Sequence, residues 1–207
     1  MNSNSIENLI KSNSKRISKT NILCIGDLIL DQYIYGNVER MSPEAPVPIL
    51  SVNDENFQLG GVGNVARNIS SLGGKATIIS LIGKDSSSKY IKKLITKEKN
   101  LKGDFVADEH YSTPLKTRFL NNFTQLLRAD KEGIISKLQT SYIQKIKDKV
   151  RKQIKHYDAV IISDYNKGLI TKELIKELVK LAKKSKRIIL ADPKSKDFKT
   201  YEGVDFL

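Results

Sequence analysis

The run Gly60-Gly61-Val62-Gly63-Asn64 leads into a predicted helix and is compatible with several kinds of chemistry. Amides at the start of a helix can bind an anion such as phosphate. Glycines have no β-carbon, so they let the backbone approach a sugar closely, or let a helix pack tightly on a sheet. The run also matches a loose dinucleotide-binding fingerprint. Gln58-Leu59 before it does not form a convincing buried strand, which disfavours a dinucleotide.

Charged side chains follow three of the predicted strands, at positions where ligands bind in open α/β sheets. Each of them also has an ordinary structural interpretation, because aspartates form turns and helix caps and most lysines are solvated. Taken singly, none of them identifies a ligand. Asp31 follows the first strand, Asp164 and Lys167 follow the strand at 158–163, and Lys194 follows the strand at 187–191.

Alternating helices and short apolar strands must position these residues. Such alternation is typical of a mostly parallel sheet covered by helices on both faces, a three-layer α/β/α fold. Asp85 and Thr171 are predicted to cap two of the helices. We expect strands at 22–26, 76–82, 158–163, 187–191 and 203–207, and helices at 62–72, 86–98, 139–155 and 171–184.

Two regions, 32–52 and 110–130, do not fit that sheet. Both alternate apolar and polar residues, and the first carries three prolines, which are tolerated at sheet edges. We expect the two regions to form a small accessory sheet or lid together. The predicted organisation is therefore a polar lead-in over 1–20 and one α/β domain over 21–207.

The chain is strongly basic, with 36 Lys and Arg against 23 Asp and Glu and a net charge of +13. Such an excess is the electrostatic footprint of nucleic-acid binding. However, the lysines are spaced along helix faces, as at Lys172, Lys176 and Lys180, and the sequence has no Trp. We interpret the charge as solvated helix faces, with attraction of phosphorylated metabolites as a second interpretation, and expect no nucleic-acid partner.

The sequence carries no signal for a membrane, for export or for a metal. No apolar run approaches the roughly 18 residues of a membrane helix, and the amino terminus lacks the apolar centre of a secretory signal. Cys24 is the single cysteine, and His110 and His156 are far apart in the sequence. We therefore expect a cytoplasmic protein with no membrane partner, no disulfide and no metal site.

In combination, the motifs resemble those of ribokinase-type carbohydrate kinases. Two runs narrow the resemblance to the D-glycero-β-D-manno-heptose 7-phosphate kinase domain of bifunctional ADP-heptose synthases, namely 163–168 (Ser-Asp-Tyr-Asn-Lys-Gly) and 192–194 (Asp-Pro-Lys). The resemblance covers about residues 22–207, and Val62 departs from it, because the family has a small residue there. It also rests on 26–31 (Gly-Asp-Leu-Ile-Leu-Asp), 42–48 (Ser-Pro-Glu-Ala-Pro-Val-Pro), Gly60-Gly61 with Asn64 and Ala66, Gly73 and Gly83.

The resemblance implies a site for a sugar phosphate under the lid. In the family, the aspartate at the position of Asp31 accepts hydrogen bonds from sugar hydroxyls, and the paired glycines admit the sugar. An asparagine side chain both donates and accepts, and a guanidinium binds phosphate through two bonds. The implied substrate-binding residues are Asp31, Gly60, Gly61, Asn64, Arg118, Arg128, Asp164 and Lys167, and Lys194 is implied to bind a phosphate group.

The implied reaction transfers the γ-phosphoryl group of ATP, with Mg²⁺, to the anomeric hydroxyl of the heptose 7-phosphate, in the synthesis of ADP-heptose for the lipopolysaccharide core. The family's catalytic base is an aspartate in a Gly-Ala-Gly-Asp motif, which does not occur in these 207 residues. In the family that motif lies beyond the position of Leu207. We therefore expect the chain to hold the sugar-binding part and the lid of the fold, without its C-terminal part or a catalytic residue, and to be nearly inactive alone.

Other functions stay open at this stage. A kinase of the same fold could act on another sugar or a nucleoside, although the runs at 42–48 and 164–168 favour heptose. A non-catalytic module that binds sugar phosphates, or a basic module that binds nucleic acid, is an alternative of a different class. The exposed edges of the predicted lid strands also favour a homodimer joined through the lids.

Overall fold

A five-stranded parallel sheet forms the centre of the computed structural model, which describes residues 13, 15–133, 139–194 and 196–207. The predicted lead-in over 1–20 lies largely outside the described residues. The strand order is β11-β10-β1-β4-β6, and each neighbouring pair is parallel. The strands are β1 (Asn21–Gly26), β4 (Lys75–Ile79), β6 (Leu101–Gly103), β10 (Ala159–Ser163) and β11 (Ile188–Asp192).

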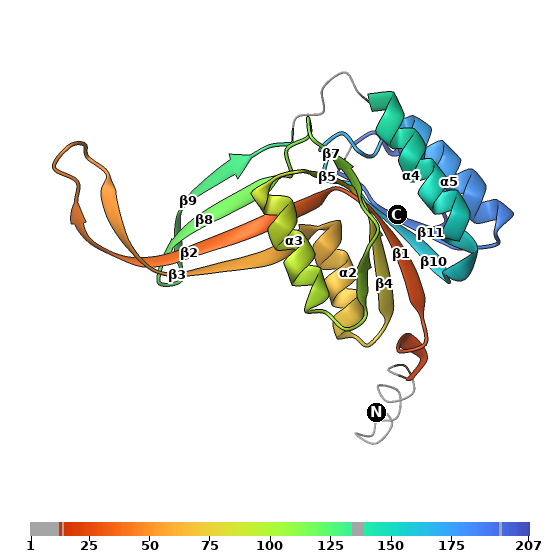
Figure 1. Cartoon of the computed structure of the whole chain (residues 1–207), viewed down its shortest axis with the longest axis horizontal. Helices are drawn as coiled ribbons and strands as arrows, with labels where there is room; N and C mark the ends of the chain where they lie inside the picture. Colours follow the sequence, from red (N-terminus) through yellow and green to blue (C-terminus); the bar gives the residue numbers. More distant parts are fainter. Residues whose placement is uncertain (1–12, 14, 134–138, 195) are drawn as a thin grey trace.

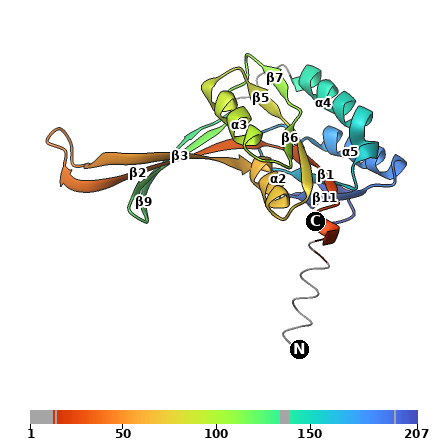
Figure 2. The same ribbon diagram turned by 60° about the horizontal axis from the view of Figure 1, so that its bottom comes forward.

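Two long helices cover each face of this sheet, which confirms the predicted α/β class with a mostly parallel sheet (Figures 1 and 2). One face carries α2 (Val62–Ser71) and α3 (Ser86–Thr96), and the other carries α4 (Gln139–Gln153) and α5 (Lys172–Lys184). Short 3₁₀ turns follow at η1 (Ile154–His156) and η2 (Phe198–Tyr201). Among the described residues, no helix is both long enough and apolar enough to span a bilayer.

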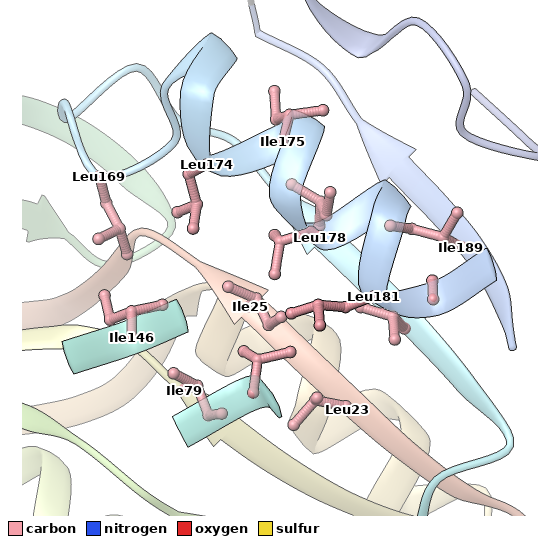
Figure 3. Packing of buried hydrophobic residues seen from close by; sticks show 14 of the residues in the cluster. Leu23, Ile25, Ile79, Ile146, Leu169, Leu174, Ile175, Leu178, Leu181 and Ile189 are labelled. Atoms are coloured by element: carbon pink, nitrogen blue, oxygen red, sulfur yellow. The ribbon is translucent and has the colours of Figure 1, made fainter. Parts of the chain in front are cut away.

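The alternation of side chains along β1 divides the core into two clusters. Leu23 and Ile25 pack with the apolar faces of α4 and α5, as Figure 3 shows, whereas Cys24 packs on the side of α2 and α3. Each fully buried aliphatic side chain stabilises the fold by roughly 1.5–3 kcal/mol relative to its exposed form. Burial raises the pKa of the Cys24 thiol to about 12, so this thiol stays protonated at neutral pH.

Both predicted helix caps are present. The Asp85 carboxylate accepts from the Ser88 amide at 2.9 Å, and the Thr171 hydroxyl accepts from the Leu174 amide at 3.2 Å. Burial alone would raise the pKa of Asp85, but the hydrogen bonds from the amides of Ser88 and Thr113 outweigh it and lower this pKa. These bonds explain why α3 and α5 begin where the sequence predicts.

The single strand predicted at 76–82 is in fact two strands. The chain leaves the central sheet at Ser80, whose buried hydroxyl donates to the carbonyl of Gly26 at 2.7 Å. The next residues form β5 (Leu81–Gly83), which pairs with β7 (Val106–Asp108) in a separate two-stranded sheet. Of the strand predicted at 203–207, the structure shows one isolated parallel bridge, from Phe206 to Leu190.

A four-stranded sheet projects from the body of the molecule, and we call it the side sheet (Figure 1). Its order is β3-β2-β8-β9, so the two proline-marked and alternating regions do form one sheet together, as predicted. It begins earlier than predicted, at Leu28, and therefore Asp31 lies within a strand rather than in a loop. The strands are β2 (Leu28–Met41), β3 (Pro48–Gly61), β8 (Leu115–Asn121) and β9 (Thr124–Lys131).

Candidate functional site

A cavity of about 230 Å³ lies where the side sheet joins the body. Its walls come from three strands of the side sheet, from the first turn of α2 and from the loop after β10. Five of the residues predicted from the sequence line it together: Asp31, Gly60, Gly61, Asn64 and Arg118. Sequence reasoning did not assign the other lining residues to a site: Ile29, Tyr33, Gln58, Leu59, Lys116 and Tyr165.

The register of the side sheet explains why these side chains meet. Asp31 on β2 is the partner of Gln58 on β3 and of Lys116 on β8, and Tyr33 is the partner of Arg118. Paired residues point to the same face of a sheet, and so do residues two apart in one strand. The register therefore places one carboxylate beside two cations on the face that lines the cavity.

Asp31 and Arg118 form an ion pair in the cavity wall. The Nη1 of Arg118 donates to Oδ1 of Asp31 at 2.6 Å, and the guanidinium lies 5.2 Å from the centre of the Tyr33 ring. Burial alone would lower the pKa of Arg118, but the hydrogen bond and charge of Asp31 raise it above its ordinary value. A guanidinium has five N–H donors, so further donors can serve a ligand.

The glycine turn lets β3 approach β2 closely enough to shape the cavity. A β-carbon on Gly60 would lie 2.2 Å from Oδ2 of Asp31. Gly61 has φ +58°, and a β-carbon there would lie 2.2 Å from the carbonyl oxygen of Asp27. The turn follows a strand that is antiparallel to β2, so it lacks the parallel βαβ context that a dinucleotide site needs.

Asn64 and Tyr165 add uncharged polar groups to the cavity wall. Asn64 lies in the first turn of α2, and Tyr165 lies in the loop after β10. Burial, followed by the negative charges of Asp192 and Asp31, raises the pKa of Tyr165. Its hydroxyl therefore stays protonated at neutral pH and can donate a hydrogen bond.

Two predicted residues, Arg128 and Asp164, are neighbours of cavity-lining residues but do not line the cavity themselves. Arg128 is next to Arg118 in the sheet, and Asp164 precedes Tyr165 in the chain. Arg128 is the register partner of Arg118 on the outer strand β9, and its Nε donates to Oδ1 of Asp130 at 2.8 Å. Asp164 is buried, and its carboxylate accepts from the Asn166 amide at 2.7 Å and from the Tyr201 hydroxyl. The contacts of Asp164 thus hold its own loop.

Neither predicted lysine lines the cavity. The ammonium group of Lys167 pairs with the carboxylate of Glu132, at 2.8 Å from Oε1 and 2.7 Å from Oε2. Lys194 is exposed just after the end of β11. The structure therefore gives the two lysines no contact with Asp31 or with the glycine turn.

Other features of the described residues do not define a second site of this kind. No group of three or more His, Cys, Asp or Glu in the described part of the chain is arranged to hold a metal ion. Two larger cavities, of about 420 and 340 Å³, contain none of the residues predicted for the site. Each is lined by three lysines: Lys145, Lys149 and Lys152 in the first, and Lys75, Lys99 and Lys102 in the second.

Comparison with known proteins gives consistent matches over most of the chain. The profile of pfkB family carbohydrate kinases matches residues 19–205. Proteins named bifunctional protein HldE are 38% identical over 196 residues in Rhodopseudomonas palustris (strain BisA53) and 39% identical over 185 residues in Aliarcobacter butzleri (strain RM4018). The matches cover 94% and 89% of this chain but only 40% and 39% of those proteins.

Solved structures of kinases share the fold. Phosphofructokinase-2 from Escherichia coli, in its tetrameric inhibited form, superposes with a TM-score of 0.63 at 20% identity, over 88% of this chain and 57% of that one. A carbohydrate kinase from Agrobacterium tumefaciens also gives a TM-score of 0.63, at 19% identity, over 83% of this chain and 53% of that one. The chain therefore spans about half the length of these kinases.

Proposed function

Because this chain belongs to the pfkB family of carbohydrate kinases, we propose that its cavity binds D-glycero-β-D-manno-heptose 7-phosphate as the acceptor of a phosphoryl group from ATP. The observation that carries the proposal is one carboxylate, Asp31, beside two cations, Lys116 and Arg118, in a single cavity. A sugar phosphate offers the matching groups, because its hydroxyls are donors and its phosphate is an anion.

In this proposal, each wall of the cavity binds a different part of the substrate. Asp31 accepts from sugar hydroxyls, and Asn64 donates to one hydroxyl and accepts from another. Gly60 has no β-carbon and so leaves room for the Asp31 carboxylate in the cavity wall. Lys116 and the free donors of Arg118 bind the phosphate through charge-assisted hydrogen bonds. Arg128, Asp164, Lys167 and Lys194 are left outside these contacts.

The choice of heptose over other sugars rests on sequence. The HldE relatives are 38–39% identical to this chain, and the runs at 42–48 and 164–168 favour the same substrate. ATP supplies the γ-phosphoryl group: the anomeric hydroxyl oxygen bonds to the γ-phosphorus, the bond to ADP breaks, and the hydroxyl loses its proton as ADP leaves. The described residues do not by themselves form a site for Mg²⁺, so the ion enters this proposal only as the counter-ion of ATP. We place the reaction in the cytoplasm, for the synthesis of ADP-heptose.

Calorimetric titration of the chain with a panel of sugars tests this proposal. We expect heptose 7-phosphate to bind most tightly, and the same heptose without its phosphate to bind roughly 30-fold more weakly. The loss of charge-assisted hydrogen bonds to the phosphate removes about 2 kcal/mol. Fructose 6-phosphate serves as the comparison for sugar identity. Tighter binding of fructose 6-phosphate than of heptose 7-phosphate, or no binding of any sugar phosphate, would contradict the proposal.

We also propose that two copies of the chain associate through their side sheets. The outer strand β9 is exposed along its whole length, and Leu127 on it is 59% exposed. Val52 on β3, at the opposite edge, is equally exposed at 59%. Exposed strand edges with apolar side chains gain stability by pairing with another sheet. Sedimentation at micromolar concentration should give a dimer, and a monomer at all concentrations would rule this association out.

A further inference from the structure

Asp27, at the junction of β1 and β2, is a buried carboxylate outside the cavity lining. Only 1% of the Asp27 surface is exposed to solvent. The Oδ2 atom accepts hydrogen bonds from two backbone amides of the loop after β10, that of Tyr165 at 2.8 Å and that of Lys167 at 3.1 Å. One carboxylate oxygen thus holds two points of this loop.

The backbone of Asp27 makes contacts in two directions as well. Its amide donates to the carbonyl of Ser163, at the end of β10, at 3.2 Å. Its carbonyl accepts from the amide of Val62, the first residue of α2, at 3.0 Å. Asp27 is therefore bonded both to the loop that carries Tyr165 and to the turn that carries Gly61, and these form two walls of the cavity.

The loop that carries Tyr165 depends on such bonds, because it has no regular secondary structure of its own. Residues 164–168 lie between β10 and α5, and two of them have positive φ, Asn166 at 56° and Gly168 at 91°. For a residue with a β-carbon, such as Asn166, this conformation persists only where surrounding contacts fix it. Asp27 supplies two of those contacts, on either side of Asn166.

We propose that Asp27 is a positioning residue for the sugar site, because its carboxylate holds the Tyr165 loop at the right distance from the glycine turn. The inference rests on the proposed function, since the site in question is the sugar-phosphate cavity. Asp27 itself touches no sugar in this arrangement. It acts through Tyr165, which lines the cavity, and through Val62 and Gly61, which precede Asn64.

Positioning and simple stabilisation by Asp27 predict different results. Its second oxygen, Oδ1, is buried and has no hydrogen-bond partner among the described residues. Burial, followed by the charge of Asp164, raises the pKa of the Asp27 carboxyl, although the amides of Lys167, Tyr165 and Leu169 partly offset this effect. A buried charge with one unsatisfied oxygen destabilises the fold. Removing the charge should therefore not lower the free energy of unfolding. It should, however, weaken the hydrogen bonds from the amides of Tyr165 and Lys167.

Asp27→Asn separates the two roles, because it keeps the shape and one acceptor oxygen while it removes the charge. A neutral acceptor binds an amide about half as strongly as a carboxylate. We expect an unfolding midpoint close to that of the wild type, because loss of the buried charge is offset by the burial of an amide NH2 in the place of Oδ1. Amide exchange at Tyr165 and Lys167 should be about tenfold faster, and heptose 7-phosphate binding about tenfold weaker. The measurements are thermal unfolding, hydrogen exchange followed by NMR, and calorimetry.

Asp158→Asn is the matched control, because the Asp158 carboxylate also accepts from a backbone amide, that of Asn21 at 2.8 Å, at the opposite end of β1. The affinity of the Asp158→Asn variant for heptose 7-phosphate should equal that of the wild type. Unchanged affinity in Asp27→Asn, or a loss of affinity only in step with unfolding, would overturn the inference. If the wild type binds no sugar phosphate, the proposed function fails instead, and the exchange rates at Tyr165 and Lys167 still test the hold on the loop.

Discussion

Arg118→Ala should weaken the binding of heptose 7-phosphate by roughly 30-fold or more, the largest loss that we expect from one side chain. The change removes the Arg118 share of the charge-assisted bonds to the phosphate, which together contribute about 2 kcal/mol. It also leaves the Asp31 carboxylate without the guanidinium that lies 2.6 Å from it. An unpaired carboxylate in this position repels a phosphate. Calorimetric titration of wild type and variant measures the effect.

Arg128→Ala is the matched control for this prediction. Arg128 is the register partner of Arg118 on the next strand, but its side chain is 48% exposed and pairs with Asp130. Exposed ion pairs contribute little, about 0–1 kcal/mol. We expect an affinity within about threefold of the wild type. A loss as large as that of Arg118→Ala would place the phosphate on the outer strand and would contradict the assigned cavity.

Gly61→Ala should lower the free energy of unfolding by about 3 kcal/mol or more, the largest expected effect on stability. Positive φ costs a residue with a β-carbon roughly 1–2 kcal/mol. The new β-carbon would also lie 2.2 Å from the carbonyl oxygen of Asp27, so either β2 or the start of α2 must move. Overpacking of this kind adds roughly 1–3 kcal/mol. Urea unfolding of the variant measures the sum.

Gly73→Ala separates backbone strain from the close contact. Gly73 has φ +92°, but a β-carbon there would have no neighbour nearer than 3.6 Å, the Cβ of Ser18. The substitution therefore carries the strain of positive φ without a clash, and should lower the free energy of unfolding by about 1–2 kcal/mol. If Gly61→Ala and Gly73→Ala lower the free energy of unfolding equally, the close contact between Gly61 and the carbonyl oxygen of Asp27 contributes nothing to the cost.

Local patterns in the sequence predicted most elements of the fold, but not β6 at the edge of the central sheet. Leu174, Leu178 and Leu181 recur at helical spacing, and all three are buried in α5. The alternation of strands and helices indicated the parallel sheet, and Asp85 and Thr171 marked two helix starts correctly. The break at Ser80 was missed. The hydroxyl of Ser80 donates there to the carbonyl of Gly26, more than fifty residues away in the chain, and no local pattern indicates such a contact.

The candidate site was only partly predictable, because its composition depends on strand register. Lys116 lies two residues before Arg118 in β8, so a strict period of two would have placed both on the same face. No local signal distinguishes Arg118 from Arg128, which differ in their distance from β2 across the sheet. The ion pair between Lys167 and Glu132 could not be predicted from local sequence either, since it joins segments far apart in the chain.

Amide chemical-shift mapping by NMR, during titration with heptose 7-phosphate, tests most directly whether the cavity at Asp31 is the sugar-phosphate site. The largest shifts should fall on Asp31, on residues 60–64, on Lys116 and Arg118, and on Tyr165, while Lys194 and Arg128 change little. Shifts concentrated instead around Lys75, Lys99 and Lys102, which line the 340 Å³ cavity, would contradict the assignment.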